Sequence, residues 1–265
     1  FEQNKRIYFT AAKLNGPHKG KTVEAIQDIN TMNVIQPNEI KSRDKIIISK
    51  MVIGEIGEEE WFFVDHNRSD ILTWFVIIFL LLVLILGRRK GLSTIISLIF
   101  TVLAVFAVFI PSILKGYNIY LSTIVISIFI TLMSMLVING ANKKTACAIA
   151  GNIGGVAVAG VIAVIMSKLL NITGIVDEDY VYLMFAQLEN PIDLIALVWS
   201  GIVIGSLGAI MDVAMSIASA MNELAENMEE KTFSRMLKSG MNIGRDAIGT
   251  MTNTLILAYV GSSLA

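Results

Sequence analysis

The sequence predicts an integral membrane protein, mainly an α-helical bundle of about six transmembrane helices, with a small β-rich domain at its N-terminus. Hydrophobic residues make up 54% of the 265-residue chain, whereas soluble domains contain about 45–50%. Charged residues make up only 16%, against about 25% in soluble domains. The charged residues are frequent in the first 70 positions, and long apolar segments follow. The chain is therefore expected to occupy two different solvents.

Residues 1–68 are assigned to the β-rich domain. Segments of β-type composition occupy residues 5–14, 21–27, 45–53 and 59–65, and turn-forming residues separate them. Four strands in so short a domain are typical of a small barrel or a half-open sheet.

Residues 69–265 are assigned to the transmembrane domain, because about 20 apolar residues cross the hydrocarbon core as a helix. The expected spans are 70–87, 92–114, 120–140, 145–170, 191–215 and 246–265. A short helix at the membrane interface is expected within 171–190. Acidic residues precede basic ones in 221–239, which predicts an amphipathic cytoplasmic helix with a break near Thr232.

Basic residues orient these spans. They follow the first, third and fifth spans: Arg88, Arg89, Lys90, Lys143, Lys144, Lys231, Arg235, Lys238 and Arg245. By the positive-inside rule these connections are cytoplasmic, which places the β-rich domain outside. The chain begins with Phe1 and ends within an apolar segment. We therefore expect a piece of a longer protein, in which an upstream segment exports the N-terminal domain.

Asp212 is the main candidate functional residue, because a carboxylate in the middle of the membrane costs about 2.5–3.5 kcal/mol on insertion scales. It lies on one helical face with other small or polar residues: Gly201, Gly205, Gly208, Ser216 and Ser219. Such a face lets another helix approach closely, and it predicts a carboxylate that faces protein or a cavity. Two simpler interpretations stay open: helix packing alone, or contact of Asp212 with cytoplasmic water.

Two other spans carry similar faces. Asp246, Thr250 and Asn253 share a face of the sixth span, although Asp246 also suits a helix start, where a carboxylate is favoured. Gly151 and Gly155 are four residues apart in the fourth span, with Asn152 beside them. We expect the fourth, fifth and sixth spans to pack together around a polar centre.

Composition and motifs also exclude several functions. The net charge of −1 gives no signal for nucleic-acid binding, and the single Cys147 excludes an intrachain disulfide. The sequence holds no motif of a hydrolase, a phosphate-binding loop or a metal centre. We therefore expect no catalytic residues, no metal and no cofactor. The expected partners are the lipid bilayer, a small solute or ion, and a second copy of the chain.

Three stretches, 87–91, 208–219 and 244–261, resemble the YibE/F-like family of bacterial membrane proteins. The resemblance covers about residues 70–265, and the N-terminal domain matches only in general character. It implies a multipass protein of the bacterial inner or plasma membrane, with further helices after residue 265. It implies little about activity.

The leading functional hypothesis is a transporter or permease-like protein for a small solute or ion. Its polar path would be lined by Asp212, Ser216, Ser219, Asp246, Thr250, Asn253 and Asn152. One alternative is a membrane scaffold without transport activity, whose outside domain binds a partner. Another is an intramembrane hydrolase in which Asp212 and Asp246 share a proton. A water-accessible cavity that reaches Asp212 would favour transport, and a dry glycine seam would favour the scaffold. The hydrolase predicts that the carboxyl groups of Asp212 and Asp246 lie close enough to share a proton.

Overall fold

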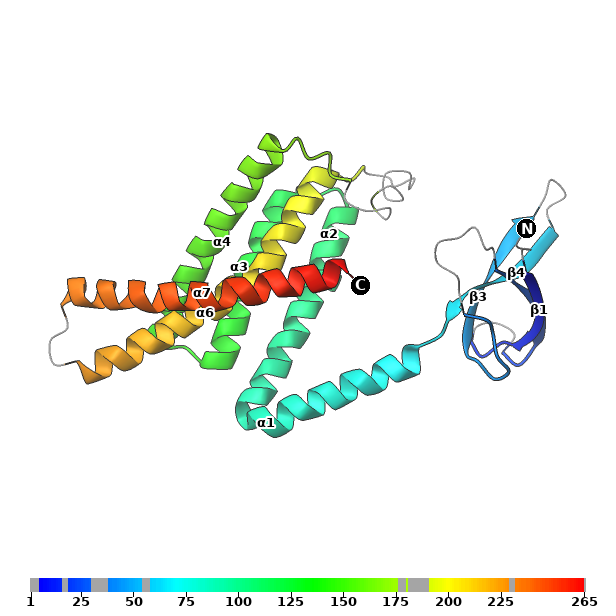
Figure 1. The fold of residues 1–265 in the computed structure, drawn as a ribbon, viewed down its shortest axis with the longest axis horizontal. Helices are drawn as coiled ribbons and strands as arrows, with labels where there is room; N and C mark the ends of the chain where they lie inside the picture. Colours follow the sequence, from blue (N-terminus) through cyan, green and yellow to red (C-terminus); the bar gives the residue numbers. More distant parts are fainter. Residues whose placement is uncertain are drawn as a thin grey trace. The chain divides into compact units, whose positions relative to one another are not determined.

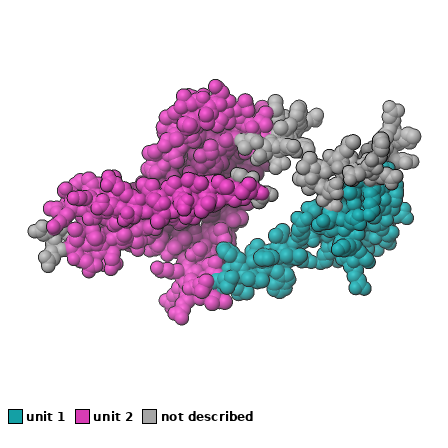
Figure 2. Space-filling view, viewed as in Figure 1, with its two compact units in different colours: residues 1–82 teal, residues 83–265 magenta. Residues whose placement is uncertain are grey.

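A computed structural model describes residues 5–15, 19–29, 38–53, 58–175, 180, 191–228 and 232–264. The chain separates into two compact units, residues 1–82 and 83–265 (Figure 2). The first unit contains a β-sheet and the start of a long helix. The second contains the remaining helices (Figure 1).

The sheet of the first unit has four strands in the order β1-β2-β4-β3. Their bounds are β1 (Lys5–Ala12), β2 (Thr22–Ile29), β3 (Ile46–Ile53) and β4 (Glu58–His66). The β1–β2 and β3–β4 pairs are antiparallel, whereas β2 and β4 are parallel. The four strands predicted from the sequence are confirmed.

β2, one of the two inner strands, carries residues that are buried in the sheet, among them Ala25, Ile26 and Gln27. The Gln27 amide donates a hydrogen bond to the Asn38 carbonyl oxygen (2.9 Å) and accepts one from the Ile40 N–H (3.1 Å). These bonds hold the segment that leads into β3. At the surface, Arg6 Nε lies 2.8 Å from Asp28 Oδ1, and this carboxylate raises the pKa of Arg6.

A helix of 46 residues, Ser69–Leu114, follows the sheet. It consists of α1 (Ser69–Leu103), a π-helical segment η1 (Ala104–Phe109) and α2 (Ile110–Leu114). Pro111 has no N–H to donate to the preceding turn, and this missing hydrogen bond accounts for the wider, π-helical turns of η1 before it. The helix bends at Arg88, whose φ of 49° and ψ of −123° are not helical.

Four further helices have bounds within the described residues. They are α3 (Ile119–Asn139), α4 (Lys143–Leu169), α6 (Leu194–Asn227) and α7 (Phe233–Ser263). Side-chain oxygens cap three of their N-termini: Asn118 accepts from the Leu121 N–H, Asn142 from the Thr145 N–H, and Asp193 from the N–H groups of Ile195 and Ala196. Such caps satisfy N–H groups that have no partner within a helix.

The described residues contain four helices long and apolar enough to cross a membrane: Ser69–Leu114, α3, α4 and α6. The predicted number of six is not supported. The predicted spans 70–87 and 92–114 lie on one bent helix, because the chain turns at Arg88 without leaving helical structure on either side. The predicted span 246–265 is the end of α7, whose apolar part is interrupted by polar residues such as Thr250 and Asn253.

Two connecting segments were also predicted. The described residues of 221–239 are divided between the end of α6 and the start of α7, and Thr232, where the break was predicted, is the N-cap of α7. The predicted interfacial helix within 171–190 falls largely on residues 176–179 and 181–190, which lie outside the described residues.

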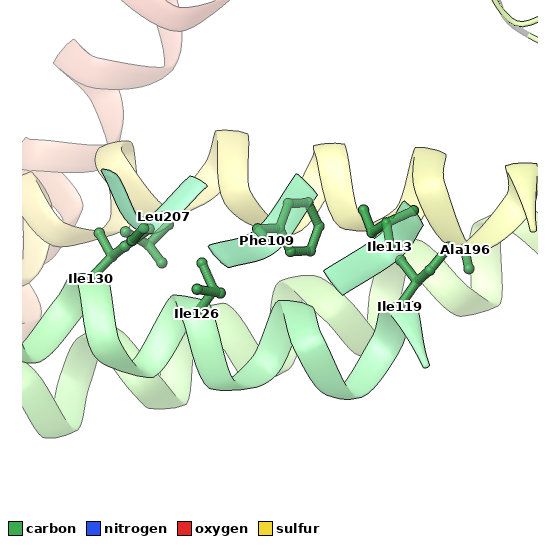
Figure 3. Close-up of a cluster of buried hydrophobic side chains, with 8 residues drawn as sticks. Phe109, Ile113, Ile119, Ile126, Ile130, Ala196 and Leu207 are labelled. Carbon is green, nitrogen blue, oxygen red and sulfur yellow. The ribbon is translucent and has the colours of Figure 1, made fainter. Parts of the chain in front are cut away.

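Buried apolar side chains join the helices of the second unit. Phe109 and Ile113 pack with Ile126 and Ile130 of α3 and with Leu207 of α6 (Figure 3). The bent helix, α3 and α6 therefore share one core, and α4 packs extensively on α6.

Candidate functional site

A cluster of buried polar side chains joins α3 to α4. Asn152 of α4 is fully buried, and its Nδ2 donates a hydrogen bond to Thr131 Oγ1 of α3 at 2.8 Å. Thr131 Oγ1 in turn donates to the Ser127 carbonyl oxygen at 2.8 Å. Ser127 and Thr131 are 4% and 1% exposed. We call these three residues the α3–α4 polar cluster.

Two atoms of the cluster have no hydrogen-bond partner among the described residues: Asn152 Oδ1 and Ser127 Oγ. Leaving a buried polar group unpaired costs about 1–3 kcal/mol. Turning the Asn152 amide over would leave its nitrogen unpaired in place of its oxygen, so the deficit does not depend on the assignment of the amide. The cluster therefore has unused capacity for hydrogen bonds near the middle of α3.

A cavity of about 420 Å³ adjoins this cluster between α3, α4 and α6. Ser127 and Thr131 line it together with apolar residues such as Ile153, Val156 and Val203. Trp199 closes one part, where its Nε1 donates to the Gly160 carbonyl oxygen at 2.9 Å. A mainly apolar cavity with a few convergent polar groups is the usual form of a small-molecule site.

Sequence reasoning identified Asn152 but missed Ser127 and Thr131. The signal was present, because α3 carries a stripe of buried hydroxyl residues at helical spacing: Thr123, Ser127, Thr131 and Ser134. Helical spacing draws attention first to faces that carry carboxylates or glycines, since a hydroxyl is less conspicuous than a carboxylate in an apolar segment.

Asp212 lies on an exposed face of α6, and Ser216 is exposed beside it. Ser219 is partly buried. The Asp212 carboxylate has no hydrogen-bond or ion-pair partner in the part of the chain that the structure describes. Asp212 is therefore not brought into the α3–α4 polar cluster.

Asp246, Thr250 and Asn253 are exposed on α7. Thr250 Oγ1 donates within its own helix, toward the carbonyl oxygens of Asp246 (3.3 Å) and Ala247 (3.1 Å). The face of α7 that packs on α6 is a different one: a Cβ at Gly240 would touch Met221, and one at Gly244 would touch Ile217. The two helices meet through small and apolar residues.

The candidate packing glycines fall into two groups. A Cβ at Gly155 would lie 2.7 Å from Ile210 Cγ2, and one at Gly151 would lie 3.9 Å from the Ala214 side chain, so α4 approaches α6 closely there. A Cβ at Gly201, Gly205 or Gly208 of α6 would meet no atom of the described residues within 4 Å. The predicted role of these three glycines in packing stays a prediction.

Among the described residues, no group of three His, Cys, Asp or Glu side chains is placed to hold a metal ion. The α3–α4 polar cluster consists of Asn152, Ser127 and Thr131, whose side chains are uncharged. It therefore offers only neutral oxygen and nitrogen groups. It can bind a water molecule, a hydrogen-bonding solute or a weakly held cation.

Four apolar helices, with a polar cluster buried between two of them, define a membrane protein. The family model of the YibE/F-like proteins matches residues 75–265, so the chain belongs to the YibE/F-like family. The resemblance seen in the sequence is confirmed. The comparisons with curated proteins and with solved structures found no match.

Proposed function

We propose that this protein is a transporter or permease-like protein for a small solute or ion. The observation that carries the proposal is a pair of buried atoms, Asn152 Oδ1 and Ser127 Oγ, that no described residue satisfies. They belong to a cluster whose Ser127 and Thr131 line a cavity near the middle of α3. In a bilayer no water from the lipid phase can satisfy such groups. Transporters commonly bind their substrates near the midplane, between helices. A passing solute would complete these hydrogen bonds.

Asp212 is assigned the second role, as carrier of a coupling proton or cation. Its carboxylate has no partner among the described residues and is exposed on a helix apolar enough to span the membrane. A carboxylate in that setting is expensive, and proteins keep such groups mainly along ion and proton pathways. Ser216 lies one turn away on the same face. Asp246, Thr250 and Asn253 are proposed to extend the polar path on α7.

We also propose a multipass topology in the bacterial inner or plasma membrane, with the β-rich domain outside. The bent helix has 46 residues, which is about 69 Å of helix at 1.5 Å per residue, more than twice the hydrocarbon thickness. Arg88, Arg89 and Lys90 lie at its bend and are exposed. Because these cations belong at a membrane surface, each arm of the helix is proposed to cross separately.

The test is flux through the reconstituted chain in proteoliposomes. Proton flux, followed with a trapped pH-sensitive dye, is expected to fall at least tenfold in Asp212→Asn. The uptake of small neutral solutes is expected to fall in Asn152→Leu. Ser206→Ala serves as control, because this hydroxyl bonds to the Val203 carbonyl oxygen of its own helix. Unchanged proton flux in Asp212→Asn would remove the carrier role.

One observation favours the scaffold as second candidate. The open face at Gly201, Gly205 and Gly208 has the small-residue pattern through which membrane helices associate. A scaffold would use it to bind a second copy of the chain. Gly205→Leu would then abolish the oligomer in cross-linking experiments, and Asp212→Asn would have no effect on function.

A further inference from the structure

The first unit holds a large cavity of about 1200 Å³ that the transport proposal does not use. Residues 9–15, which include the end of β1, line it on one side, and residues 40–48, which lead into β3, line it on another. These strands are the two edges of the sheet. The Lys13 ammonium nevertheless lies 4.2 Å from the centre of the Trp61 ring on β4. The sheet is therefore curled, and the cavity lies between its edges.

The cavity wall is strongly basic. It contains five cationic side chains and two carboxylates: Lys13, Lys19, Lys41, Arg43, Lys45, Asp44 and Asp70. This excess of three positive charges contrasts with the net charge of −1 of the whole chain. Positive charge is thus concentrated on the wall of this cavity, although the domain carries many acidic residues elsewhere.

Both carboxylates are already engaged. Asp70 forms an ion pair with Lys45. Asp44 Oδ2 accepts a hydrogen bond from the Lys41 backbone N–H at 2.8 Å and lies 3.7 Å from His66 Nδ1. Among the residues that the structure describes, the side chains of Lys19, Lys41 and Arg43 have no ion-pair partner and are exposed. The cavity therefore presents cations that can bind an anion.

A tight turn presents two of these cations. The Asp44 N–H donates to the Lys41 carbonyl oxygen at 3.1 Å, and Arg43 within this turn has a φ of 77°. A residue other than glycine seldom adopts this left-handed conformation, and functional sites are enriched in it. The turn holds Lys41 and Arg43 close together in the chain, and a guanidinium can bind two phosphate oxygens at once.

The cavity also includes the start of α1. Asn67, Ser69 and Asp70 line it, and the apolar residues of the membrane span begin at Ile71. The Lys45–Asp70 ion pair and the hydrogen bond from the Asn67 N–H to the Lys45 carbonyl oxygen (2.7 Å) fix the sheet to this helix start. When α1 crosses the bilayer, the basic wall is thereby held at the depth of the lipid headgroups.

We infer that this cavity binds the anionic headgroup of a phospholipid in the surrounding membrane. Lys41 and Arg43 contact the phosphate, Lys19 adds to the positive potential, and Trp61 and Phe9 contact the apolar part of the headgroup region. Basic residues beside a membrane span attract anionic lipids in this way. The inference is independent of transport, because it concerns the first unit alone.

Native mass spectrometry of the purified chain in detergent tests this directly. Phosphatidylglycerol is titrated against the protein, and phosphatidylcholine of the same chain length serves as the uncharged comparison. Each surface cation contributes about a fivefold change in lipid affinity, so the variant Lys41→Ala/Arg43→Ala is expected to lose phosphatidylglycerol affinity about 30-fold. The control Lys21→Ala/Lys115→Ala removes two exposed cations outside the cavity and is expected to keep it.

Three results would overturn the inference: equal affinity of the wild-type chain for the two lipids, equal losses in the two double variants, or displacement of the lipid by millimolar inorganic phosphate. The last result would assign the site to a soluble anion. The thermal unfolding temperature of the Lys41→Ala/Arg43→Ala variant is compared with that of the wild type. If the two temperatures are equal, a lost affinity does not reflect a misfolded domain.

Discussion

The Asn152 side chain donates a hydrogen bond to the Thr131 hydroxyl at 2.8 Å, and this bond joins α4 to α3. Because Thr131 donates its own proton to the Ser127 carbonyl oxygen, the three residues form a short chain of donors and acceptors. The chain ends at Asn152 Oδ1, which has no partner among the described residues. Most buried side-chain polar atoms have a hydrogen-bond partner, so the open end of this buried amide favours a binding role over a purely structural one.

The first prediction separates these roles by comparing one substitution with two. Thr131→Val removes the acceptor of the Asn152 amide and leaves that buried group unpaired, so the free energy of unfolding should fall by about 1–3 kcal/mol. In Thr131→Val/Asn152→Leu both partners become apolar, and stability should return to within about 1 kcal/mol of wild type. Thermal or SDS-induced unfolding in detergent measures both.

The double variant also reports on function. If the α3–α4 polar cluster binds a solute, a stable Thr131→Val/Asn152→Leu protein will have lost uptake in proteoliposomes. Full uptake in a protein of wild-type stability would show that the cluster serves packing alone. Thr101→Val is the matched control, because its hydroxyl bonds to the Ser97 carbonyl oxygen of its own helix.

The second prediction concerns two neighbouring glycines of α4. A Cβ at Gly155 would lie 2.7 Å from Ile210 Cγ2, whereas one at Gly154 would meet nothing within 4 Å among the described residues. Gly155→Ala should therefore destabilise the protein by about 1–3 kcal/mol through overpacking. Gly154→Ala should stabilise it by as much as about 1 kcal/mol, because alanine favours helix more than glycine does. Unfolding in detergent measures both changes.

A double variant tests whether Ile210 is the cause. Removing Cγ2 in Ile210→Ala should restore part of the stability lost in Gly155→Ala, with a coupling of about 0.5–3 kcal/mol. Additive effects of the two substitutions would show that the α4–α6 contact does not depend on this pair.

Composition and apolar length made much of the fold predictable. The four strands follow from segments of β-type composition between turn-forming residues, and the helices α3, α4 and α6 follow from apolar length. Asn118, Asn142 and Asp193 cap these helices where the sequence changes from polar to apolar. The number of helices did not follow. A Gly-Arg-Arg-Lys-Gly sequence predicts a loop, but here the backbone turns at the single residue Arg88 and stays helical on both sides.

The candidate site was only partly predictable. Asn152 stood out as an amide among small residues, yet its partner Thr131 lies on another helix, and a single sequence does not show which helices touch. The Asp212 face was recognised from its spacing, but spacing does not tell which faces are covered. In this chain another side of α6, with Ile210 and Ala214, packs on α4.

The third prediction concerns the bend of the long helix. A Cβ at Gly91 would lie 2.3 Å from the Val83 carbonyl oxygen, a backbone atom that cannot turn away. Gly91→Ala should therefore open the bend. Spin labels at Leu84→Cys and Ile96→Cys, with Cys147→Ser to avoid a third label, should then move apart toward the separation of a straight helix, about 18 Å for twelve residues.

Gly87 supplies the control for this experiment, since it lies next to Arg88 and a Cβ there would meet nothing within 4 Å in the described part of the chain. Gly87→Ala should leave the distance between the labels unchanged. If the bend lets each arm cross the membrane, opening it also moves Arg88 and its basic neighbours away from the surface, and insertion of the chain should fall in Gly91→Ala alone. An unchanged label distance in Gly91→Ala would show that the close approach to Val83 does not determine the bend.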